Sequence, residues 1–511
     1  MIINRTENSI RNATFGLINK VLTLLMPFIV RTVFIRTLGA DYLGLNSLFT
    51  SILTVLNLTE LGFSSAIVFC MYKPIADDDT DTINALLLFY KKTYRYIGLI
   101  IACIGCALIP FLPLLIKGEY PANINLITVY LVFLFNTVIS YFLFAYLSSL
   151  IVAFQREDVL SKVNIVIALL MYSSQILVLL YVNNYYVYLF TMPIFTIINN
   201  IRTAIIAKKM FPDYKPKGEV TLQLRNEIKE KVKGLFIFKI CYVSRNALDS
   251  IFVSVFLGLI DTAIYNNYFY VMNAVIGITT VLTSSMLAGV GNSVVKDSES
   301  KNYHDMNRIN FIYMWISGWF VSCLVCLYQP FMYLWVGKSL MYPMSVVVLF
   351  SIYFYILKLG DVRYIYEQAK GMWWEYRYRS IAETLGNIML NAILGKLFGI
   401  YGIIAATIIT LFFINYFYGA KIIFKSYFKN ESIAVYHKQN ALYTLSASIA
   451  SLITYFSTSW MEYSILWIII RLLICLILPN IILFLLLFRS NEYRDTLPWL
   501  KKRIPILSKF I

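Results

Sequence analysis

The chain is a succession of long apolar segments joined by short polar connections, and this alternation limits what it can fold into. A helix that crosses about 30 Å of hydrocarbon needs about 20 mostly apolar residues. Fourteen such segments follow one another along the 511 residues: 15–35, 43–69, 97–116, 124–150, 159–181, 185–207, 234–257, 263–289, 309–336, 341–357, 380–397, 400–424, 441–459 and 464–488. The sequence therefore predicts an all-α, polytopic membrane protein with about 14 transmembrane helices.

The composition supports this fold class and excludes a soluble enzyme. Hydrophobic residues make up 59% of the chain and charged residues 14%, whereas a soluble domain is about 45–50% apolar and about 25% charged. A single globular core cannot hide that much apolar surface from water. The sequence contains no P-loop, and neither histidine lies in a predicted span. We therefore expect no catalytic residues, no metal site and no resident cofactor.

Positive charges are distributed unevenly between the connections, and this predicts the topology. Basic residues of membrane proteins concentrate in cytoplasmic connections. If both termini are cytoplasmic, the odd-numbered connections lie outside, and only four basic residues lie on or beside them, namely Arg36, Lys117, Lys338 and Lys396. By contrast, 35 basic residues lie on or beside the termini and the even-numbered connections. We therefore predict cytoplasmic termini, and the net charge of +17 requires no nucleic-acid partner.

The spans form two sets of six on either side of the longest polar break. Residues 1–207 are the predicted N-lobe and residues 234–424 the predicted C-lobe, while residues 425–511 add two spans and a basic cytoplasmic tail. The break at 208–233 is predicted to be a cytoplasmic amphipathic linker. Within 219–235, apolar residues recur at helical spacing among Lys and Glu, as in a helix that lies on the membrane surface.

A short motif occurs once in each predicted lobe and indicates an internal repeat. Lys20 and Lys239 lie inside spans, and each is followed at the same distance by a Leu-Gly pair that ends in Gly39 or Gly258. Internal repeats are common in transporters. Because each set contains an even number of spans, the lobes are predicted to be parallel repeats. Their pseudo-symmetry is expected to bring the two lysines to facing positions.

Basic side chains inside the predicted spans are the candidate substrate-binding residues. A charged group at the bilayer centre costs about 2.5–3.5 kcal/mol or more, so it usually faces a cavity or a partner. The candidates are Lys20 and Arg31 on the first span, with Lys239 and Arg245 on the seventh. Their structural alternative is that these long side chains reach the interface or form ion pairs. A cationic cavity favours an anionic substrate such as a diphosphate.

Two acidic residues inside the predicted spans are candidates for ion coupling or for the cavity wall. Glu60 lies in the second span, and Asp249 lies in the seventh, four residues after Arg245. That spacing allows a helical ion pair between Arg245 and Asp249, which leaves Lys239 as the less compensated charge. If transport is coupled to Na⁺ or H⁺, these carboxylates are the expected ligands.

Two motifs near the N-terminus resemble a known family. Residues 37–45 (TLGADYLGL) and 58–67 (LTELGFSSAI) are similar to the opening of the bacterial polysaccharide transporters, the Wzx-type flippases of O-antigen, capsule and exopolysaccharide in the MATE-like MOP superfamily. The resemblance implies a non-enzymatic flippase that moves undecaprenyl-diphosphate-linked oligosaccharide across the bacterial cytoplasmic membrane by alternating access. It also implies membrane lipids, a polysaccharide polymerase and a chain-length regulator as partners. It supplies no fixed substrate-site motif.

The main alternative is a MATE-type, cation-coupled exporter of drugs or other small molecules. Such a transporter favours acidic groups in its cavity, whereas the balance in these spans is basic. A membrane glycosyltransferase or polymerase normally has a large external loop, and the predicted outer connections are too short for one. A structural scaffold has no need of lysine and arginine inside its spans.

Overall fold

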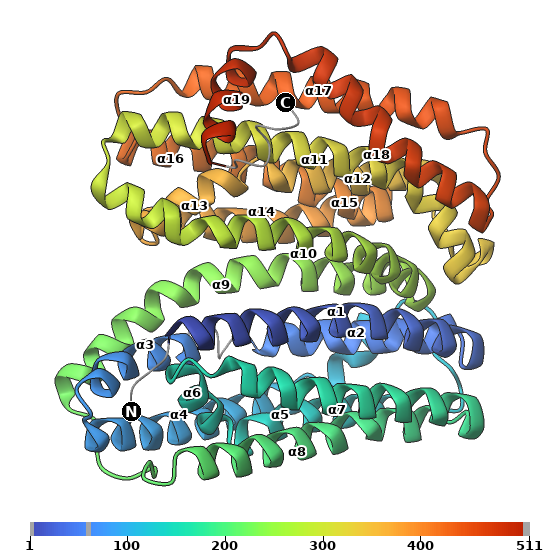
Figure 1. Ribbon diagram of the computed structural model, residues 1–511. Coiled ribbons are helices and arrows are strands. Elements are labelled where there is room, and N and C mark those ends of the chain that lie inside the picture. Colours follow the sequence, from blue (N-terminus) through green and yellow to red (C-terminus); the bar gives the residue numbers. More distant parts are fainter. Residues whose placement is uncertain (1–4, 58–62, 504–511) are drawn as a thin grey trace. The chain divides into compact units, whose positions relative to one another are not determined.

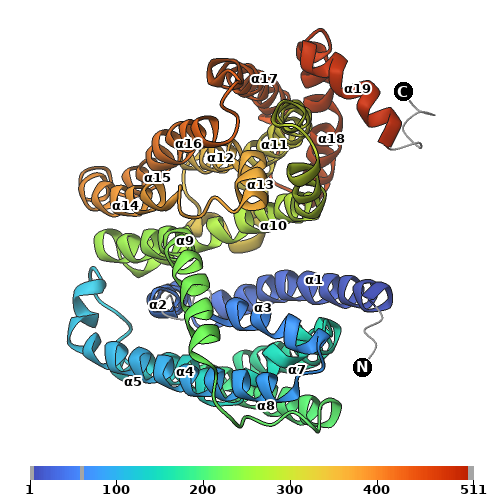
Figure 2. The ribbon, with the colours of Figure 1, turned by 90° about the vertical axis from the view of Figure 1, so that its left-hand side faces the viewer.

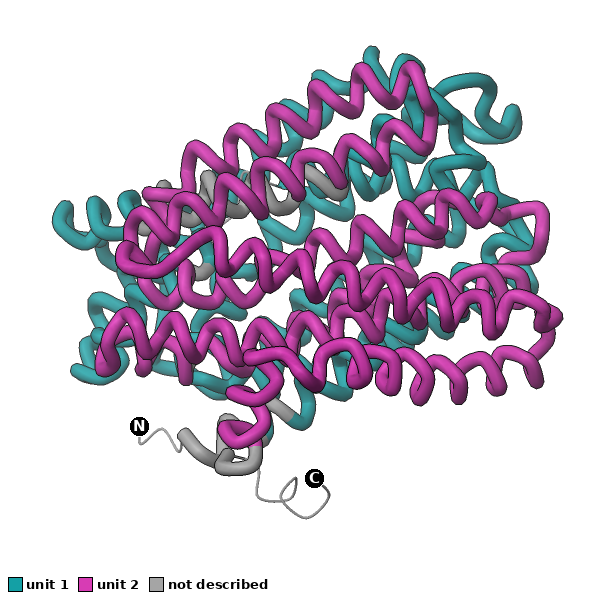
Figure 3. The backbone as a smooth tube through the Cα atoms, turned by 90° about the horizontal axis from the view of Figure 1, so that it is seen from above, with its two compact units in different colours: residues 1–263 teal, residues 264–511 magenta. Residues whose placement is uncertain are grey.

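The computed structural model describes residues 5–57 and 63–503, and every regular element in these ranges is a helix (Figure 1). The predicted all-α fold is therefore confirmed. The chain divides into two compact units, Met1–Ala263 (unit 1) and Ile264–Ile511 (unit 2) (Figure 3).

Unit 1 contains the helices that precede the division and the first turn of α10. They are α1 (Arg5–Thr37), α2 (Ala40–Leu56), α3 (Phe63–Ala76), α4 (Thr80–Ala107), η2 (Ile109–Leu115), α5 (Leu126–Phe142), α6 (Ala145–Ala153), α7 (Glu157–Leu177), η3 (Val178–Val182), α8 (Tyr185–Met210) and α9 (Leu222–Leu257). Within this unit α1 packs along α7, and α2 packs along α9.

Unit 2 contains most of α10 and the helices that follow it. They are α10 (Leu259–Lys296), α11 (Glu299–Val336), η4 (Lys338–Leu340), α12 (Met344–Lys358), α13 (Asp361–Lys370), α14 (Arg377–Phe398), α15 (Ile400–Ile409), η5 (Thr410–Tyr418), α16 (Gly419–Ser426), α17 (Ile433–Thr458), α18 (Ile465–Leu487) and α19 (Asn491–Arg503). Here α11 packs against both α17 and α18, and α14 packs against α15.

The helices of the described ranges are those of a multi-pass membrane protein. Eight are long and apolar enough to cross a membrane, and ten segments qualify if each of two bent helix pairs is one span. Other expected spans are occupied by shorter apolar helices, such as α2 with 17 residues. The expected span at 43–69 corresponds to α2 and α3, and residues 58–62 between them lie outside the described part of the chain.

Two of the expected spans are bent. α4 and η2 meet at 60°, and α5 and α6 meet at 53°. Pro110 and Pro113 lie in η2, where each removes a backbone donor and prevents α4 from continuing. At the second bend, Phe144 adopts a left-handed conformation with φ of 59°, which interrupts the helix between α5 and α6.

α9 joins two segments that the sequence pattern separates. It runs without a break from Leu222 to Leu257 (Figure 2), so the end of the expected linker at 208–233 and the expected seventh span form one helix. Thr221 caps its start, because its hydroxyl accepts a hydrogen bond from the backbone N–H of Leu224 at 3.3 Å. The division between the compact units comes after α9.

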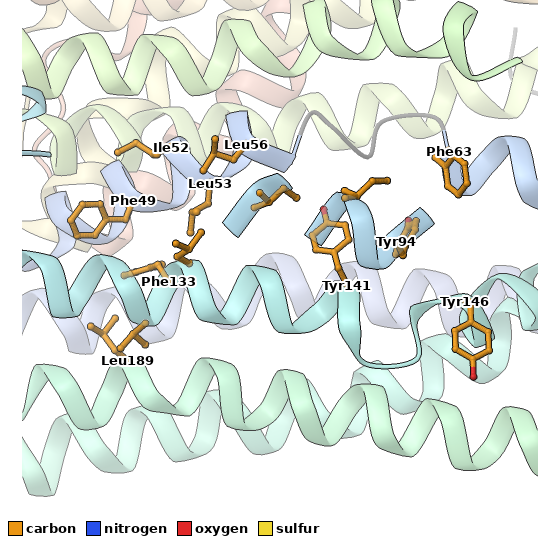
Figure 4. Close-up of a cluster of buried hydrophobic side chains, with 14 of the residues drawn as sticks. Phe49, Ile52, Leu53, Leu56, Phe63, Tyr94, Phe133, Tyr141, Tyr146 and Leu189 are labelled. Carbon is orange, nitrogen blue, oxygen red and sulfur yellow. The ribbon is translucent and has the colours of Figure 1, made fainter. Parts of the chain in front are cut away.

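The apolar core of unit 1 lies where α2, α4 and α5 meet. Phe49, Leu53 and Phe133 are buried there (Figure 4), and the Phe49 ring meets the Tyr130 ring edge-on with centroids 5.5 Å apart. α2 also lies against the start of α10 at a glycine. A Cβ on Gly44 would overlap the carbonyl oxygen of Leu259, so only glycine permits this approach.

The expected repeat of the Leu-Gly turn is visible in the backbone. Gly39 joins α1 to α2 with φ of 100° and ψ of 175°, and Gly258 joins α9 to α10 with φ of 99° and ψ of −173°. This region of φ and ψ is essentially restricted to glycine. Two turns that lie far apart in the sequence therefore share one unusual conformation.

The same periodicity extends to other turns and to helix caps. Three further pairs of positive-φ residues recur at the same or nearly the same separation as Gly39 and Gly258: Gly118 with Gly337, Gln155 with Gly371, and Asn183 with Gly399. Asp79 and Ser298, which share that separation, cap α4 and α11 by accepting hydrogen bonds from Thr82 N and Lys301 N. The hydrogen bonds from Thr82 hold the pKa of the Asp79 carboxyl below its usual value, which keeps a negative charge at the helix start.

Candidate functional site

Two of the predicted cationic residues lie on α1. Lys20 and Arg31 are eleven residues apart, about three turns, and so share one face of the helix. The Lys20 side chain is exposed beside exposed apolar residues such as Leu17 and Val21, and its ammonium has no hydrogen-bond or ion-pair partner in the described part of the chain. Arg31 is half-buried, and its charge acts on the phenol of Tyr188 in α8.

The other predicted site residues lie on α9 or in the break after α2. Lys239 and Arg245 are on α9, but their side chains are outside the described part of the structure, and so is Glu60. Asp249 is fully buried on α9 and has an interaction partner. The expected cationic cavity therefore remains a prediction, with Lys20 as its described and accessible member.

A second group of charges, which the sequence pattern does not reveal, is buried inside unit 2. We call it the α13 charge network; it consists of Lys358, Asp361, Arg363, Glu367, Arg379 and Glu383. All except Asp361 are no more than 7% exposed. They come from the end of α12, from α13 and from the start of α14. Burial of so many charged groups is expensive unless they neutralise one another.

Arg363 is the centre of this network, and all three nitrogens of its guanidinium donate hydrogen bonds. Its Nε donates to the Glu367 carboxylate at 2.6 Å, one turn along α13. Its two Nη groups donate to the backbone carbonyls of Tyr416 at 2.7 Å and Asn415 at 2.8 Å. Both carbonyls belong to η5, a π-helix.

Two glycines make the space that the Arg363 guanidinium fills. A Cβ on Gly419 would lie 2.5 Å from an Nη atom of Arg363, and a Cβ on Gly360 would lie 3.2 Å from the same atom. The first of these distances is shorter than any van der Waals contact. The arginine therefore requires glycine at the start of α16 and little bulk where α12 passes into α13.

Buried Lys358 and half-buried Asp361 form a second ion pair in the network. The Lys358 ammonium donates to the Asp361 carboxylate at 2.7 Å, and the Tyr313 hydroxyl of α11 donates to the same oxygen at 2.5 Å. The carboxylate thus receives two donors from different helices. This arrangement ties the end of α12 to α11 at the point where the chain turns into α13.

The remaining members connect the network to η5 and α17. Glu383 accepts a hydrogen bond from the Asn415 side chain at 2.9 Å. His437 Nδ1 lies 2.9 Å from the Tyr416 hydroxyl. Arg379 has no carboxylate within 4 Å in the described part of the chain, and its guanidinium stacks on the Tyr376 ring at 5.0 Å. The network is thus mainly internally neutralised, which is typical of a structural arrangement rather than of a substrate site.

The sequence pattern assigns all of these residues except Glu383 to the cytoplasmic connection between the tenth and eleventh spans, because the apolar segment at 341–357 is followed by a segment rich in acidic and basic residues. The structure adds that five of the six side chains are buried inside the protein. The available signal was their spacing, with Arg363 and Glu367 four apart and Lys358 and Asp361 three apart. Such pairs neutralise each other along one helix face, so a charged segment is able to enter a protein interior.

All of the described buried carboxylates have an interaction partner, whereas two of the described buried arginines have no carboxylate nearby. Each of the four buried carboxylates in the described ranges has a partner: Asp158, Asp249, Glu367 and Glu383. Among the buried bases, Arg379 and Arg471 have no carboxylate within 4 Å in those ranges. Arg471, on α18, instead donates to the carbonyls of Cys326 and Met461. The described interior therefore contains four buried acids and four buried bases, and two of the bases are arginines without a nearby carboxylate.

No described group of three or more His, Cys, Asp or Glu side chains is arranged to hold a metal ion. The chain also matches no protein-family model and no curated protein sequence.

The fold is similar to those of solved transporters. A lipid II flippase, MurJ, in its inward closed conformation aligns with a TM-score of 0.66 at 15% identity over 94% of this chain and 99% of that chain. An inward-facing multidrug resistance MATE transporter gives 0.62 at 12% identity over 83% and 99%. A Pyrococcus furiosus MOP-superfamily transporter, described as having a binding pocket of reverse polarity, gives 0.52 at 13% identity over 82% and 96%. The protein has the fold of the MOP-superfamily transporters.

Proposed function

We propose that this protein is a flippase that moves polyprenyl-diphosphate-linked oligosaccharide across the bacterial cytoplasmic membrane by alternating access, for surface polysaccharide synthesis. The observation that carries the proposal is the exposed ammonium of Lys20 on an apolar helix, in a chain whose four described buried carboxylates each have a partner. A diphosphate supplies the anion that such a cation binds. The proposal includes no enzymatic step.

The fold comparisons agree with this choice without deciding it. The match to the lipid II flippase takes in 94% of this chain, compared with 83% for the MATE transporter. A lipid-linked substrate also suits a protein with so much apolar surface, because the polyprenyl chain remains in the hydrocarbon while the polar head group crosses.

A cation-coupled exporter of drugs or small molecules is the second candidate, since MATE transporters share the fold. It requires a carboxylate that is able to exchange its partner for a substrate cation. Asp249 is the described acid that fits this role best, because it is fully buried on α9. Coupling of either transport activity to Na⁺ or H⁺ is proposed to use the same carboxylate.

Deletion of the gene separates these two functions. A flippase mutant is expected to accumulate lipid-linked oligosaccharide in the cytoplasmic leaflet, where an added glycosidase does not reach it in intact cells, and to lose surface polysaccharide. Its sensitivity to cationic drugs and dyes is expected to stay unchanged. If surface polysaccharide persists in a strain with no second flippase while dye efflux falls, the exporter is the correct function.

A further inference from the structure

Unit 1 contains a pocket of about 620 Å³ that is lined by none of the candidate transport residues. We call it the η2 pocket, because Pro110 and Pro113 of η2 form one side of it. Its other walls come from the connection between η2 and α5 and from the start of α8. This volume lies within the range of about 300–1,000 Å³ that is usual for small-ligand sites. The connection is predicted to be extracytoplasmic.

The pocket presents two carboxamides in fixed orientations. The Tyr42 hydroxyl donates to Asn123 Oδ1 at 2.6 Å, and the backbone N–H of Thr128 donates to Asn125 Oδ1 at 3.0 Å. Each amide oxygen is therefore engaged inside the protein. Each amide NH₂ has two donors, and neither NH₂ group has a partner in the described part of the chain.

Two tyrosines add aromatic surface to the pocket. The Tyr186 hydroxyl accepts a hydrogen bond from the backbone N–H of Asn125 at 2.7 Å, which fixes its half-buried ring in the wall. Tyr120 is 39% exposed and also lines the pocket. Tyrosine combines an apolar ring face with a polar hydroxyl, and this combination matches a sugar ring, which has apolar C–H faces and a rim of hydroxyl groups.

The charge of the lining narrows the class of ligand further. Among the described residues, no Lys, Arg, His, Asp or Glu side chain lines the pocket. An ionic ligand would therefore find no opposite charge in this lining. A neutral ligand rich in hydroxyl groups instead uses the amide donors as hydrogen-bond partners and the tyrosine rings as packing surfaces.

We propose that the η2 pocket is a glycan-binding site that receives the oligosaccharide head group on the extracytoplasmic side. This inference rests on the proposed flippase function, since that function supplies the glycan. Binding at this site holds the head group away from the transport path after translocation. It thereby disfavours return of the lipid-linked oligosaccharide to the cytoplasmic leaflet.

Asparagine-to-aspartate variants test this site without removing its structural hydrogen bonds. Asn123→Asp keeps an oxygen for the Tyr42 hydroxyl, and Asn125→Asp keeps the cap on Thr128 N, because aspartate caps helices as well as asparagine does. Both variants lose the NH₂ donors. Asn184→Asp is the matched control, because Asn184 caps α8 through Tyr186 N and Val187 N but does not line the pocket.

The probe is the oligosaccharide released by mild acid from the lipid-linked oligosaccharide of the source cells. Its binding to purified full-length protein in nanodiscs is measured by saturation-transfer difference NMR and titration. We expect about tenfold weaker binding for each of Asn123→Asp and Asn125→Asp, since each loses a hydrogen bond to the ligand. Tyr120→Ala is expected to weaken binding similarly. Asn184→Asp and Tyr181→Ala, a change at an 82% exposed tyrosine outside the pocket, are expected to bind like the wild type.

Translocation of the intact lipid-linked oligosaccharide is measured in parallel with the wild-type protein in proteoliposomes. If the wild type translocates it, and if the released glycan either fails to bind or binds equally to the pocket variants, the glycan site is wrong and the flippase function stands. If the wild type does not translocate it, the flippase function itself fails, and the glycan site that depends on it fails as well. Thermal unfolding of each variant confirms that the protein compared is folded.

Discussion

Gly419 lies directly against the Arg363 guanidinium, so closely that a Cβ at this glycine would be 2.5 Å from an Nη atom. The contact joins the start of α16 to α13 inside unit 2. It explains how a full positive charge is packed into an apolar helical unit, because the guanidinium occupies the volume of a missing side chain and reaches two carbonyls of the π-helix.

Gly419→Ala is expected to destabilise the protein by about 1–3 kcal/mol, the usual cost of overpacking. The guanidinium has nowhere to move, since its other sides are held by Glu367 and by η5. The measurement is the thermal unfolding temperature in detergent. Gly289→Ala on α10 is the control, because a Cβ there meets no atom within 4 Å. An equal effect of the two changes would contradict the close contact.

Glu367→Gln is expected to be strongly destabilising, by about 3–5 kcal/mol, because it leaves the charge of Arg363 buried without its carboxylate. The matched control is the Lys301–Asp297 ion pair, in which the residues are also four apart and the charged atoms lie 2.7 Å from each other, but Lys301 is exposed and Asp297 only half-buried. Lys301→Gln is expected to cost less than about 1 kcal/mol. Yield of folded protein and unfolding temperature distinguish the two variants. A similar fall in unfolding temperature for both variants would show that burial does not determine how much the Arg363–Glu367 pair contributes to stability.

The topology is tested by accessibility of single cysteines in a background without the native ones. Glu119→Cys lies in a predicted outer connection and Lys215→Cys in the predicted cytoplasmic linker, and both positions are exposed. A membrane-impermeant maleimide is expected to label position 119 in intact cells and position 215 only after permeabilisation. The opposite pattern would overturn the predicted orientation of every span.

The cationic cavity predicts that export depends on the charge of Lys20 and Lys239. Lys→Gln at either position is expected to reduce export at least tenfold, because the diphosphate loses a positive partner, a loss of about 1.4 kcal/mol or more. Lys→Arg is expected to retain part of the activity, since the charge remains while its geometry changes. Export is measured as surface polysaccharide at equal membrane abundance. Normal export by both Gln variants would mean that these lysines only anchor the helices at the interface.

The all-α, multi-pass fold could be predicted because hydrocarbon imposes a minimum length on each apolar segment. The bends could be predicted only in part. Pro110 and Pro113 are visible signals in the sequence, whereas the left-handed Phe144 depends on packing between α5 and α6. The continuity of α9 could not be inferred from hydropathy, since the polar residues after Leu222 and the apolar residues before Leu257 share one helix.

The candidate site illustrates a second limit of sequence reasoning. A charge count identifies Lys20, because a lone ammonium in an apolar segment is conspicuous. The same count does not reveal the burial of Arg363, because it only places this residue after a short apolar segment, in a predicted cytoplasmic connection. Recognition of its burial needs the carbonyls of η5 and the space beside Gly419, which are distant from Arg363 in the sequence.

The pairing of Gln155 with Gly371 has a practical consequence for handling the protein. Both residues adopt the left-handed conformation, with φ of 58° and 69°, but only the second is glycine. A non-glycine residue in this conformation is strained by about 1–2 kcal/mol. Gln155 therefore carries this backbone strain, whereas Gly371 at the corresponding position of the other repeat does not. Copying the glycine back, as Gln155→Gly, therefore offers a rational route to a protein that survives detergent extraction for longer.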